Sequence, residues 1–170
     1  EALELHKVTN KTKRNALIPL RGVFSLAMEE ELVAANPVSA VRLRKHQKPP
    51  ILRFTPAEKA KVLSKLTGEA RLFYTIAFET GMRTGEILGL CWEDITNDTI
   101  TLTRAIVRRE VSGLKNSQVR SVFIAPRLKQ VLMDNPDRFA GGYVFKHKLG
   151  GPCLDAHPFT KAWKESLKKC

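Results

Sequence analysis

Arg83 has the most informative surroundings in this sequence, because it lies between Gly81 and Gly85. A glycine at this spacing is typical of the end of one helix, and the two glycines allow a backbone to approach closely. An arginine at such a junction projects beside the N–H groups and positive end of the next helix. Its guanidinium can donate two hydrogen bonds to one phosphate, so the pattern indicates phosphate binding. A structural ion pair with Glu79 or Glu86 is the alternative.

The charge of the chain also points to phosphate. Its 170 residues include 29 Lys and Arg against 17 Asp and Glu, a formal charge of +12, and a surplus of this size favours a polyanionic partner. From Leu32 to Ala57 there is no acidic residue, while Pro49 and Pro50 stiffen the centre. We interpret this stretch as a basic linker that faces DNA, a solvated tether without a partner being the alternative. Its basic residues are Arg42, Arg44, Lys45, Lys48 and Arg53.

Two further groups of basic residues follow. The first has only Glu110 as a counterweight and consists of Arg104, Arg108, Arg109, Lys115 and Arg120. We expect Lys115, Arg108 and Arg120 to face DNA. The second group, near the end of the chain, is interpreted as the solvated face of a helix and consists of Lys161, Lys164, Lys168 and Lys169.

Several other kinds of site are excluded. No apolar run approaches the roughly 20 residues that cross a bilayer, so no membrane partner is expected. Three cysteines without CxxC spacing argue against a disulfide scaffold and suit a reducing compartment. The spacing of His147, Cys153 and His157 matches no common zinc pattern. Glycine-rich nucleotide loops are also absent, and we expect neither a metal nor a cofactor.

The elements that must position these residues are mostly helical. Helical spacing and capping signals predict helices over residues 11–35, 55–68, 71–80, 85–90, 126–132 and 159–167, with a kink or a helix start near Pro19. Alternation predicts strands over 100–107 and 120–124, with a turn at Ser112-Gly113. The order predicts an α+β fold, mainly α with a small antiparallel sheet.

The stretch from Thr80 to Ile95 resembles the first arginine box of the tyrosine recombinase (phage integrase) family. That pattern is Thr-Gly-hydrophobic-Arg-x-x-Glu-hydrophobic-x-x-Leu followed by Trp-x-Asp-hydrophobic, and every position is matched. Residues 113–122 are similar to the family's hairpin, in which a lysine precedes Arg-x-Val. Residues 27–37 resemble the last helix of its core-binding domain, which closes on Asn-Pro. The resemblance therefore covers nearly the whole chain.

The resemblance implies roles for individual residues. Arg83 would contact the scissile phosphate, Lys115 would be the hairpin lysine that protonates the leaving oxygen, and Glu86 would position the arginine. In the family a tyrosine attacks the phosphate and forms a 3′-phosphotyrosyl link. The family's His-x-x-Arg motif and late tyrosine are absent here, and we interpret Tyr74 and Tyr143 as packing residues. No nucleophile is therefore expected in this chain.

We expect a fragment, because Glu1 is not a start methionine and the last helix stops mid-pattern. Its parts would be the end of a core-binding domain (1–43), a linker (44–54) and the first half of a catalytic domain (55–170). The resemblance implies a cytoplasmic bacterial or phage protein that acts on double-stranded DNA. The parent would be a tetramer on DNA and the fragment an inactive monomer. The alternatives are a non-catalytic DNA-binding module, such as a truncated or decayed integrase, and a basic RNA-binding protein.

Overall fold

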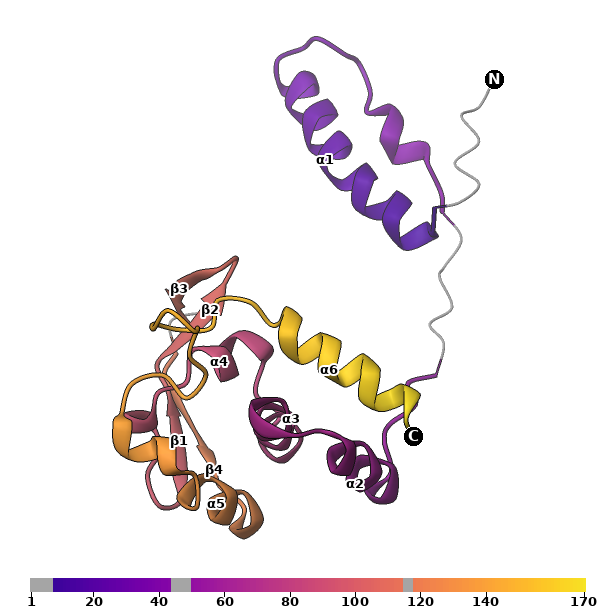
Figure 1. Ribbon diagram of the computed structural model, residues 1–170. Helices are drawn as coiled ribbons and strands as arrows, with labels where there is room; N and C mark the ends of the chain where they lie inside the picture. The colour runs from indigo at the N-terminus through magenta and orange to yellow at the C-terminus, as the bar shows by residue number, and fades with distance from the viewer. Residues whose placement is uncertain (1–7, 44–49, 115–117) are drawn as a thin grey trace. The chain divides into compact units, whose positions relative to one another are not determined.

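The computed structural model describes residues 8–43, 50–114 and 118–170 (Figure 1). The chain divides into two compact units, Glu1–Arg53 and Phe54–Cys170, which we describe separately. Among the described residues, none of the helices combines the length and the apolar character that crossing a bilayer requires.

The first unit consists of a long helix, α1 (Asn10–Glu29), and a short 3-10 helix, η1 (Pro37–Ala40). The side chain of Asn36 connects them, because its Nδ2 donates to the carbonyl oxygen of Arg21 at 3.0 Å and its Oδ1 accepts from the N–H of Val38 at 3.0 Å. Val38 is buried, whereas α1 buries none of its residues.

Helix α1 differs from the prediction at its end and at its proline. The predicted helix over 11–35 ends at Glu29, and Glu31 has a φ of 57° just beyond it. Pro19 lies inside one helix, so no new helix starts there. Among the apolar residues of α1, Leu20 is 47% and Met28 is 42% exposed.

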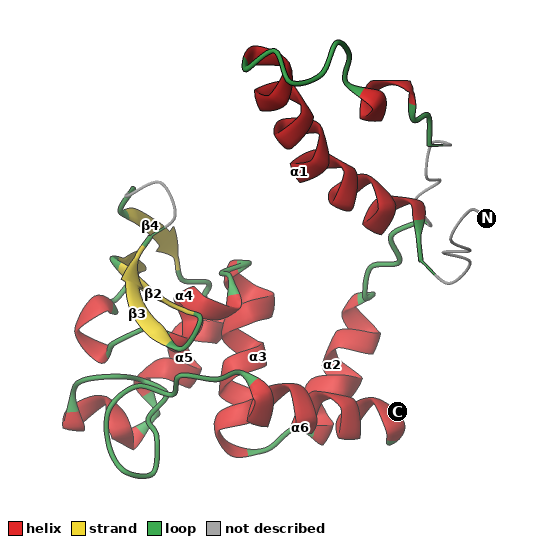
Figure 2. Cartoon of the chain, turned by 90° about the horizontal axis from the view of Figure 1, so that it is seen from above, coloured by secondary structure: helices red, strands yellow, loops and turns green. Residues whose placement is uncertain are grey.

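The second unit is α+β, as predicted. Its helices are α2 (Pro56–Lys65), α3 (Gly68–Thr80), α4 (Thr84–Leu88), α5 (Pro126–Met133) and α6 (His157–Lys168), with 3-10 turns η2 (Trp92–Asp94) and η4 (Pro136–Ala140). Figures 1 and 2 both show α3 between the strands on one side and α2 on the other. This central helix leads directly to Arg83.

The strands form two antiparallel pairs. β1 (Thr99–Leu102) pairs with β4 (Arg120–Phe123), and β2 (Arg104–Val107) pairs with β3 (Glu110–Gly113). The single strand predicted over 100–107 is therefore two strands. The turn predicted at Ser112-Gly113 is wrong, since those residues belong to β3 and the chain reverses at Arg108-Arg109.

The capping signals of the predicted helices are mostly confirmed. Thr55 and Glu58 form a reciprocal capping box at the start of α2, and Gly81 ends α3 with a φ of 65°. Gly68 was predicted to end the helix before it, but it is the first residue of α3 and α2 ends at Lys65. Helix α4 starts at Thr84 and ends at Leu88, earlier than predicted at both ends.

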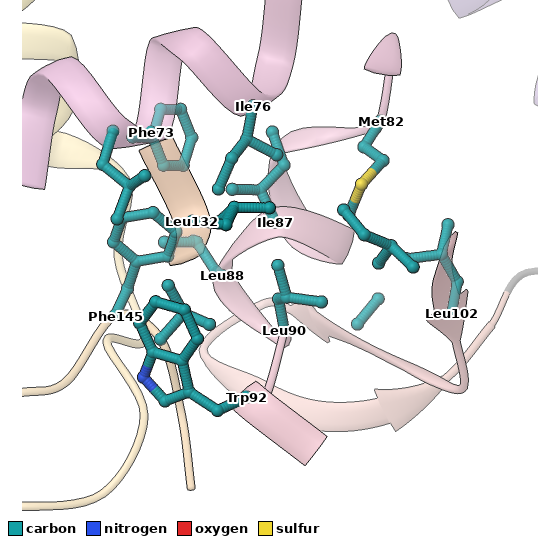
Figure 3. Packing of buried hydrophobic residues seen from close by; sticks show 14 of the residues in the cluster. Phe73, Ile76, Met82, Ile87, Leu88, Leu90, Trp92, Leu102, Leu132 and Phe145 are labelled. Carbon is teal, nitrogen blue, oxygen red and sulfur yellow. The ribbon is translucent and has the colours of Figure 1, made fainter. Parts of the chain in front are cut away.

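One hydrophobic core joins these elements. Phe73 and Ile76 of α3 are buried in one cluster with Ile87 of α4 and Leu102 of β1 (Figure 3). Phe73 stacks on Phe159 of α6 with ring centroids 4.5 Å apart. The core therefore fixes α4 and β1, the two elements next to the candidate site.

Two glycines let α4 lie directly on β2. A Cβ added at Gly85 would stand 2.4 Å from the carbonyl oxygen of Ile106, and one at Gly89 would stand 3.1 Å from the Cα of Ala105. At Gly85 the added Cβ would clash with backbone, so only glycine fits, whereas at Gly89 the neighbouring backbone would have to shift by a few tenths of an ångström. Of the two glycines predicted to allow close approach, Gly85 does so against β2, within the protein, whereas a Cβ added at Gly81 would meet nothing within 4 Å.

Candidate nucleic-acid interface

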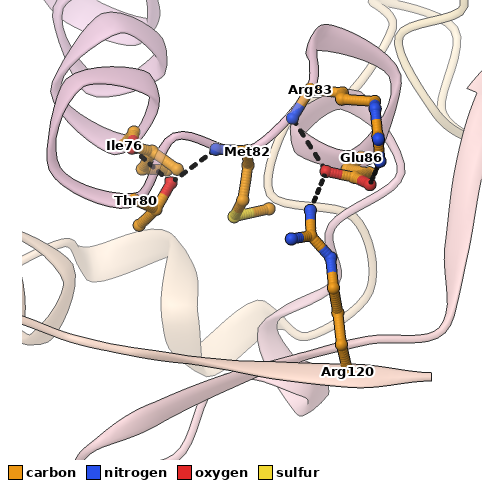
Figure 4. A network of polar contacts seen from close by, with 6 residues as sticks. All are labelled: Ile76, Thr80, Met82, Arg83, Glu86 and Arg120. Carbon is orange, nitrogen blue, oxygen red and sulfur yellow. Dashed lines mark hydrogen bonds and ion pairs between the residues drawn. The ribbon is translucent and has the colours of Figure 1, made fainter. Parts of the chain in front are cut away.

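The centre of the candidate site is the carboxylate of Glu86, which is 4% exposed. Its Oε2 accepts from the backbone N–H of Arg83 at 2.7 Å, and its Oε1 accepts from Arg83 Nη1 at 2.9 Å. Arg120 Nη2 donates to Oε2 at 2.7 Å. One buried carboxylate thus holds two guanidinium groups from distant parts of the sequence (Figure 4).

The backbone before Arg83 is fixed by a local network. Thr80 Oγ1 donates to the carbonyl oxygen of Ile76 at 2.6 Å and accepts from the N–H of Met82 at 3.2 Å (Figure 4). Met82 is 5% exposed and belongs to the core. The turn between α3 and α4 is therefore held from both sides, and the Arg83 side chain leaves a rigid point.

Arg120 is positioned by the sheet. It is the first residue of β4 and pairs with Leu102 of β1, which is 2% exposed. This register brings Arg120 to Glu86 across 34 residues of sequence. Sequence reasoning assigned Arg120 to DNA but missed its contact with Glu86, since no local pattern encodes the pairing of β1 with β4.

The charges of the cluster do not cancel. The two guanidinium groups carry two positive charges against one carboxylate, and their side chains remain 69% (Arg83) and 47% (Arg120) exposed. Burial raises the pKa of Glu86, but the N–H and guanidinium of Arg83 together with Arg120 outweigh it and hold the pKa below its ordinary value. Glu86 therefore stays ionised, and the exposed part of the cluster is cationic.

The alternative interpretation of Arg83, a structural ion pair, is confirmed in part. Arg83 does form an ion pair, and its partner is Glu86, whereas Glu79 pairs with Lys59 at 2.8 Å. The start of α4 contributes little to phosphate binding, because the helix has only five residues and the Arg83 N–H already donates to Glu86. The positive potential at this site comes from the guanidinium groups.

The other predicted cations lie elsewhere. Arg104 Nη1 donates to Asp94 Oδ2 at 2.6 Å, and the same oxygen accepts from the N–H of Cys91, so Arg104 ties β2 to η2. Arg109 pairs with Asp155 at 2.5 Å, whereas Arg108 is exposed in the turn between β2 and β3.

The linker residues are only partly described. Arg42 and Arg53 belong to the first unit and are exposed. The remaining predicted contacts lie outside the described residues, namely Arg44, Lys45, Lys48 and the proposed hairpin lysine Lys115.

Both tyrosines of the chain are engaged in the fold. Tyr74 is half-buried, its hydroxyl donates to the carbonyl oxygen of Phe159 at 3.3 Å, and burial raises its pKa. Tyr143 is half-buried and bridges to Cys91. Within the described ranges, no three His, Cys, Asp or Glu side chains are grouped closely enough to hold a metal.

Comparison with known proteins gives relatives of one kind. The ICEBs1 integrase of Bacillus subtilis is 34% identical over 91 residues, covering 52% of this chain and 25% of the relative. A shufflon-specific DNA recombinase of Escherichia coli is 30% identical over 169 residues, covering 95% of this chain and 39% of the relative. A XerC-like tyrosine recombinase of Caldanaerobacter subterraneus is 26% identical over 189 residues, covering 88% of this chain and 48% of the relative. No family model matches the chain.

Solved structures give the same fold. The integrase of the transposon Tn1549, in complex with a circular intermediate DNA, superposes with a TM-score of 0.77 at 20% identity, over 99% of this chain and 62% of that one. A lambda integrase dimer bound to a core site superposes with a TM-score of 0.66 at 19% identity, over 96% and 51%. The fold is that of tyrosine recombinase catalytic domains.

The relatives are integrases and tyrosine recombinases, so the similarity to this family that the arginine box predicted is confirmed. It spans between a quarter and a half of the length of these curated relatives.

Proposed function

We propose that this chain is the DNA-binding part of a site-specific tyrosine recombinase that cuts and rejoins DNA through a 3′-phosphotyrosyl intermediate. The observation that carries the proposal is the buried carboxylate of Glu86 holding two exposed guanidinium groups. Relatives that are recombinases, and similar folds solved with DNA, support it. Three cysteines without a disulfide fit a reducing compartment, and we place the activity in the cytoplasm.

In the proposed reaction Arg83 binds the scissile phosphate. Negative charge grows on the phosphate oxygens as the attacking and leaving oxygens share the phosphorus, and a guanidinium held in place in advance stabilises that charge. Glu86 fixes Arg83 by two hydrogen bonds, so little reorganisation is needed at the moment of reaction. Lys115 is proposed as the acid that protonates the leaving 5′ oxygen. A covalent phosphotyrosyl link preserves the phosphodiester energy for rejoining.

We propose further that this chain alone binds DNA without cleaving it. Tyr74 donates its hydroxyl to a backbone carbonyl, and Tyr143 is half-buried beside Cys91. Among the described residues, the side-chain hydrogen bond of Arg83 goes to Glu86 and not to either tyrosine. We therefore propose that the chain, when it is alone, acts as the non-catalytic DNA-binding module that the sequence offered as an alternative.

DNA affinity tests the binding proposal. Fluorescence anisotropy with a short labelled duplex is expected to give a dissociation constant that rises about tenfold or more for Arg83→Ala, as for loss of a charge-assisted contact. Arg127→Ala on α5 removes the same charge from another element and serves as the matched control. Equal effects of the two substitutions, at unchanged thermal stability, would leave only non-specific charge and contradict the role of Arg83.

A covalent-adduct assay tests the lack of cleavage. The chain is incubated with a nicked duplex that traps a phosphotyrosyl product, and the reaction is resolved on a denaturing gel. We expect no shifted protein band. A band that disappears in Tyr74→Phe or Tyr143→Phe would identify a nucleophile and overturn the proposal.

A further inference from the structure

Arg120 has the same environment as Arg83, although it lies in a different part of the sequence. Each guanidinium donates one side-chain hydrogen bond to Glu86, and each side chain is about half exposed or more. A guanidinium has five N–H donors. Among the described residues, neither head group has another polar partner, so most of their donors face solvent.

The shared carboxylate keeps the two head groups close. Arg120 and the Arg83 backbone donate to the same oxygen, Oε2, and the Arg83 side chain donates to the other oxygen. Two guanidinium groups that approach one another repel unless an anion lies between them. Glu86 supplies that anion on the buried side, which leaves the exposed side of the pair without one.

The elements behind the two arginines are rigid. Arg83 follows a turn fixed by Thr80 and the buried Met82. Arg120 is held by the register of β4 on β1, opposite the buried Leu102. A pair of donors fixed in this way favours an anion of the size and charge of a phosphate, since no side chain needs to be reordered on binding.

We propose that Arg83 and Arg120 bind the same DNA phosphate, and that Glu86 is the positioning residue that holds both guanidinium groups. This inference rests on the proposed function and deepens it. Arg120 is the arginine of the hairpin's Arg-x-Val and belongs neither to the arginine box nor to the family's His-x-x-Arg motif. It follows the proposed hairpin lysine and adds a second arginine to the first half of the catalytic domain.

The salt dependence of DNA binding separates one shared phosphate from two. The slope of log Kd against log salt changes by about 0.9 for each phosphate contact that is lost. We expect Arg83→Ala and Arg120→Ala each to weaken binding about tenfold. The double variant should flatten the slope by about 0.9, as for one phosphate. The matched pair Arg83→Ala with Arg127→Ala should show independent effects on Kd.

Other outcomes would overturn the inference. A slope flattened by about 1.8 in the double variant means two separate phosphates. An Arg120→Ala affinity equal to that of Arg127→Ala means no contact by Arg120. If Arg120→Ala lowers the melting temperature strongly, Arg120→Lys decides, because it keeps the charge and loses the planar fork. We expect Arg120→Lys to keep the slope and to lose affinity, whereas unchanged affinity would contradict the binding of one phosphate by both arginines. Failure of the unsubstituted chain to bind DNA, by contrast, would reject the proposed function itself.

Discussion

At the scale of single residues, Glu86 explains more of the site than Arg83 does. A buried carboxylate is costly unless it is hydrogen-bonded and paired, and this one accepts three hydrogen bonds, two of them from guanidinium groups. In this arrangement the carboxylate is the buried charge, and the two guanidinium groups that pair with it stay exposed. Glu86 therefore organises the site, while Arg83 and Arg120 present it to the solvent.

The first prediction concerns the pH dependence of stability at Glu86. Its pKa is below the ordinary value of 4.5 in the folded protein, so its ionised form stabilises the fold above about pH 4.5, and this contribution is lost as pH falls through the folded pKa. Glu86→Gln should lower the free energy of unfolding at pH 7 by about 1–3 kcal/mol. Urea unfolding at a series of pH values should show this difference shrinking towards acid pH.

A carboxylate on the surface of α6 gives the control for Glu86. Glu165 is exposed, and Glu165→Gln should change stability by no more than about 0.5 kcal/mol at any of these pH values. A Glu86→Gln difference that stays constant down to acid pH would show that shape, and not charge, accounts for the loss.

At the scale of elements, the site depends on the contact of α4 with β2. Helix α4 is only five residues long and gains its stability from packing. Gly85 makes the tightest part of that contact, against the carbonyl oxygen of Ile106. Any side chain at this position must push the helix that carries Glu86 away from the strand.

The second prediction follows from this contact. Gly85→Ala places a Cβ 2.4 Å from a backbone oxygen and should destabilise the protein by about 1–3 kcal/mol through overpacking. Thermal or urea unfolding measures it. Gly113→Ala in β3 is the matched control, because an added Cβ meets nothing within 4 Å there. Equal stability of the two variants would mean that α4 can shift without cost.

The third prediction concerns the turn between β2 and β3. Arg108 and Arg109 have φ values of 52° and 67°, a region that costs a residue with a Cβ about 1–2 kcal/mol. Arg108→Gly should therefore be more stable than Arg108→Ala by about 1 kcal/mol. Both variants remove the same charge, so their DNA affinities should fall equally. A lower DNA affinity for only one of them would show that the turn geometry matters for binding.

The same turn shows where prediction from sequence stops. The caps at Thr55 and Gly81 were predictable because one residue type and its neighbours determine them. The reversal at Arg108-Arg109 was not, since turns of this kind normally carry Asn or Gly. The Arg120 contact was not predictable either, because it depends on which strand pairs with β1. Local chemistry identified Arg83, and only tertiary pairing added Arg120.

At the scale of the whole molecule, the basic residues behind the net charge of +12 differ in how far nearby carboxylates neutralise them. Arg104 and Arg109 are engaged in ion pairs within the fold. The acid-free stretch from Leu32 to Ala57 contains no carboxylate that could neutralise its basic residues locally. The lysines of α6 are exposed but belong to one helix face with Glu165 nearby. Charge that is not neutralised locally is the charge available to DNA.

The fourth prediction compares four of the five basic residues of the linker with the four lysines of α6 and its end. Neutralising the linker group should flatten the slope of log Kd against log salt by up to about 3.6, which is about 0.9 for each of four phosphates. Preference between DNA sequences should change little, because phosphate contacts position a protein and do not read bases. The group consists of Arg42, Arg44, Lys45 and Lys48.

The matched control removes the same charge from α6 and its end, through Lys161, Lys164, Lys168 and Lys169. If binding followed net charge alone, both fourfold variants would lose the same slope, since each lowers the charge from +12 by four. We expect the α6 variant to keep nearly the full slope, because its lysines form a solvated face. An unchanged slope in the linker variant would contradict a DNA-facing linker and assign the phosphate contacts to the second unit, where Arg83 and Arg120 lie.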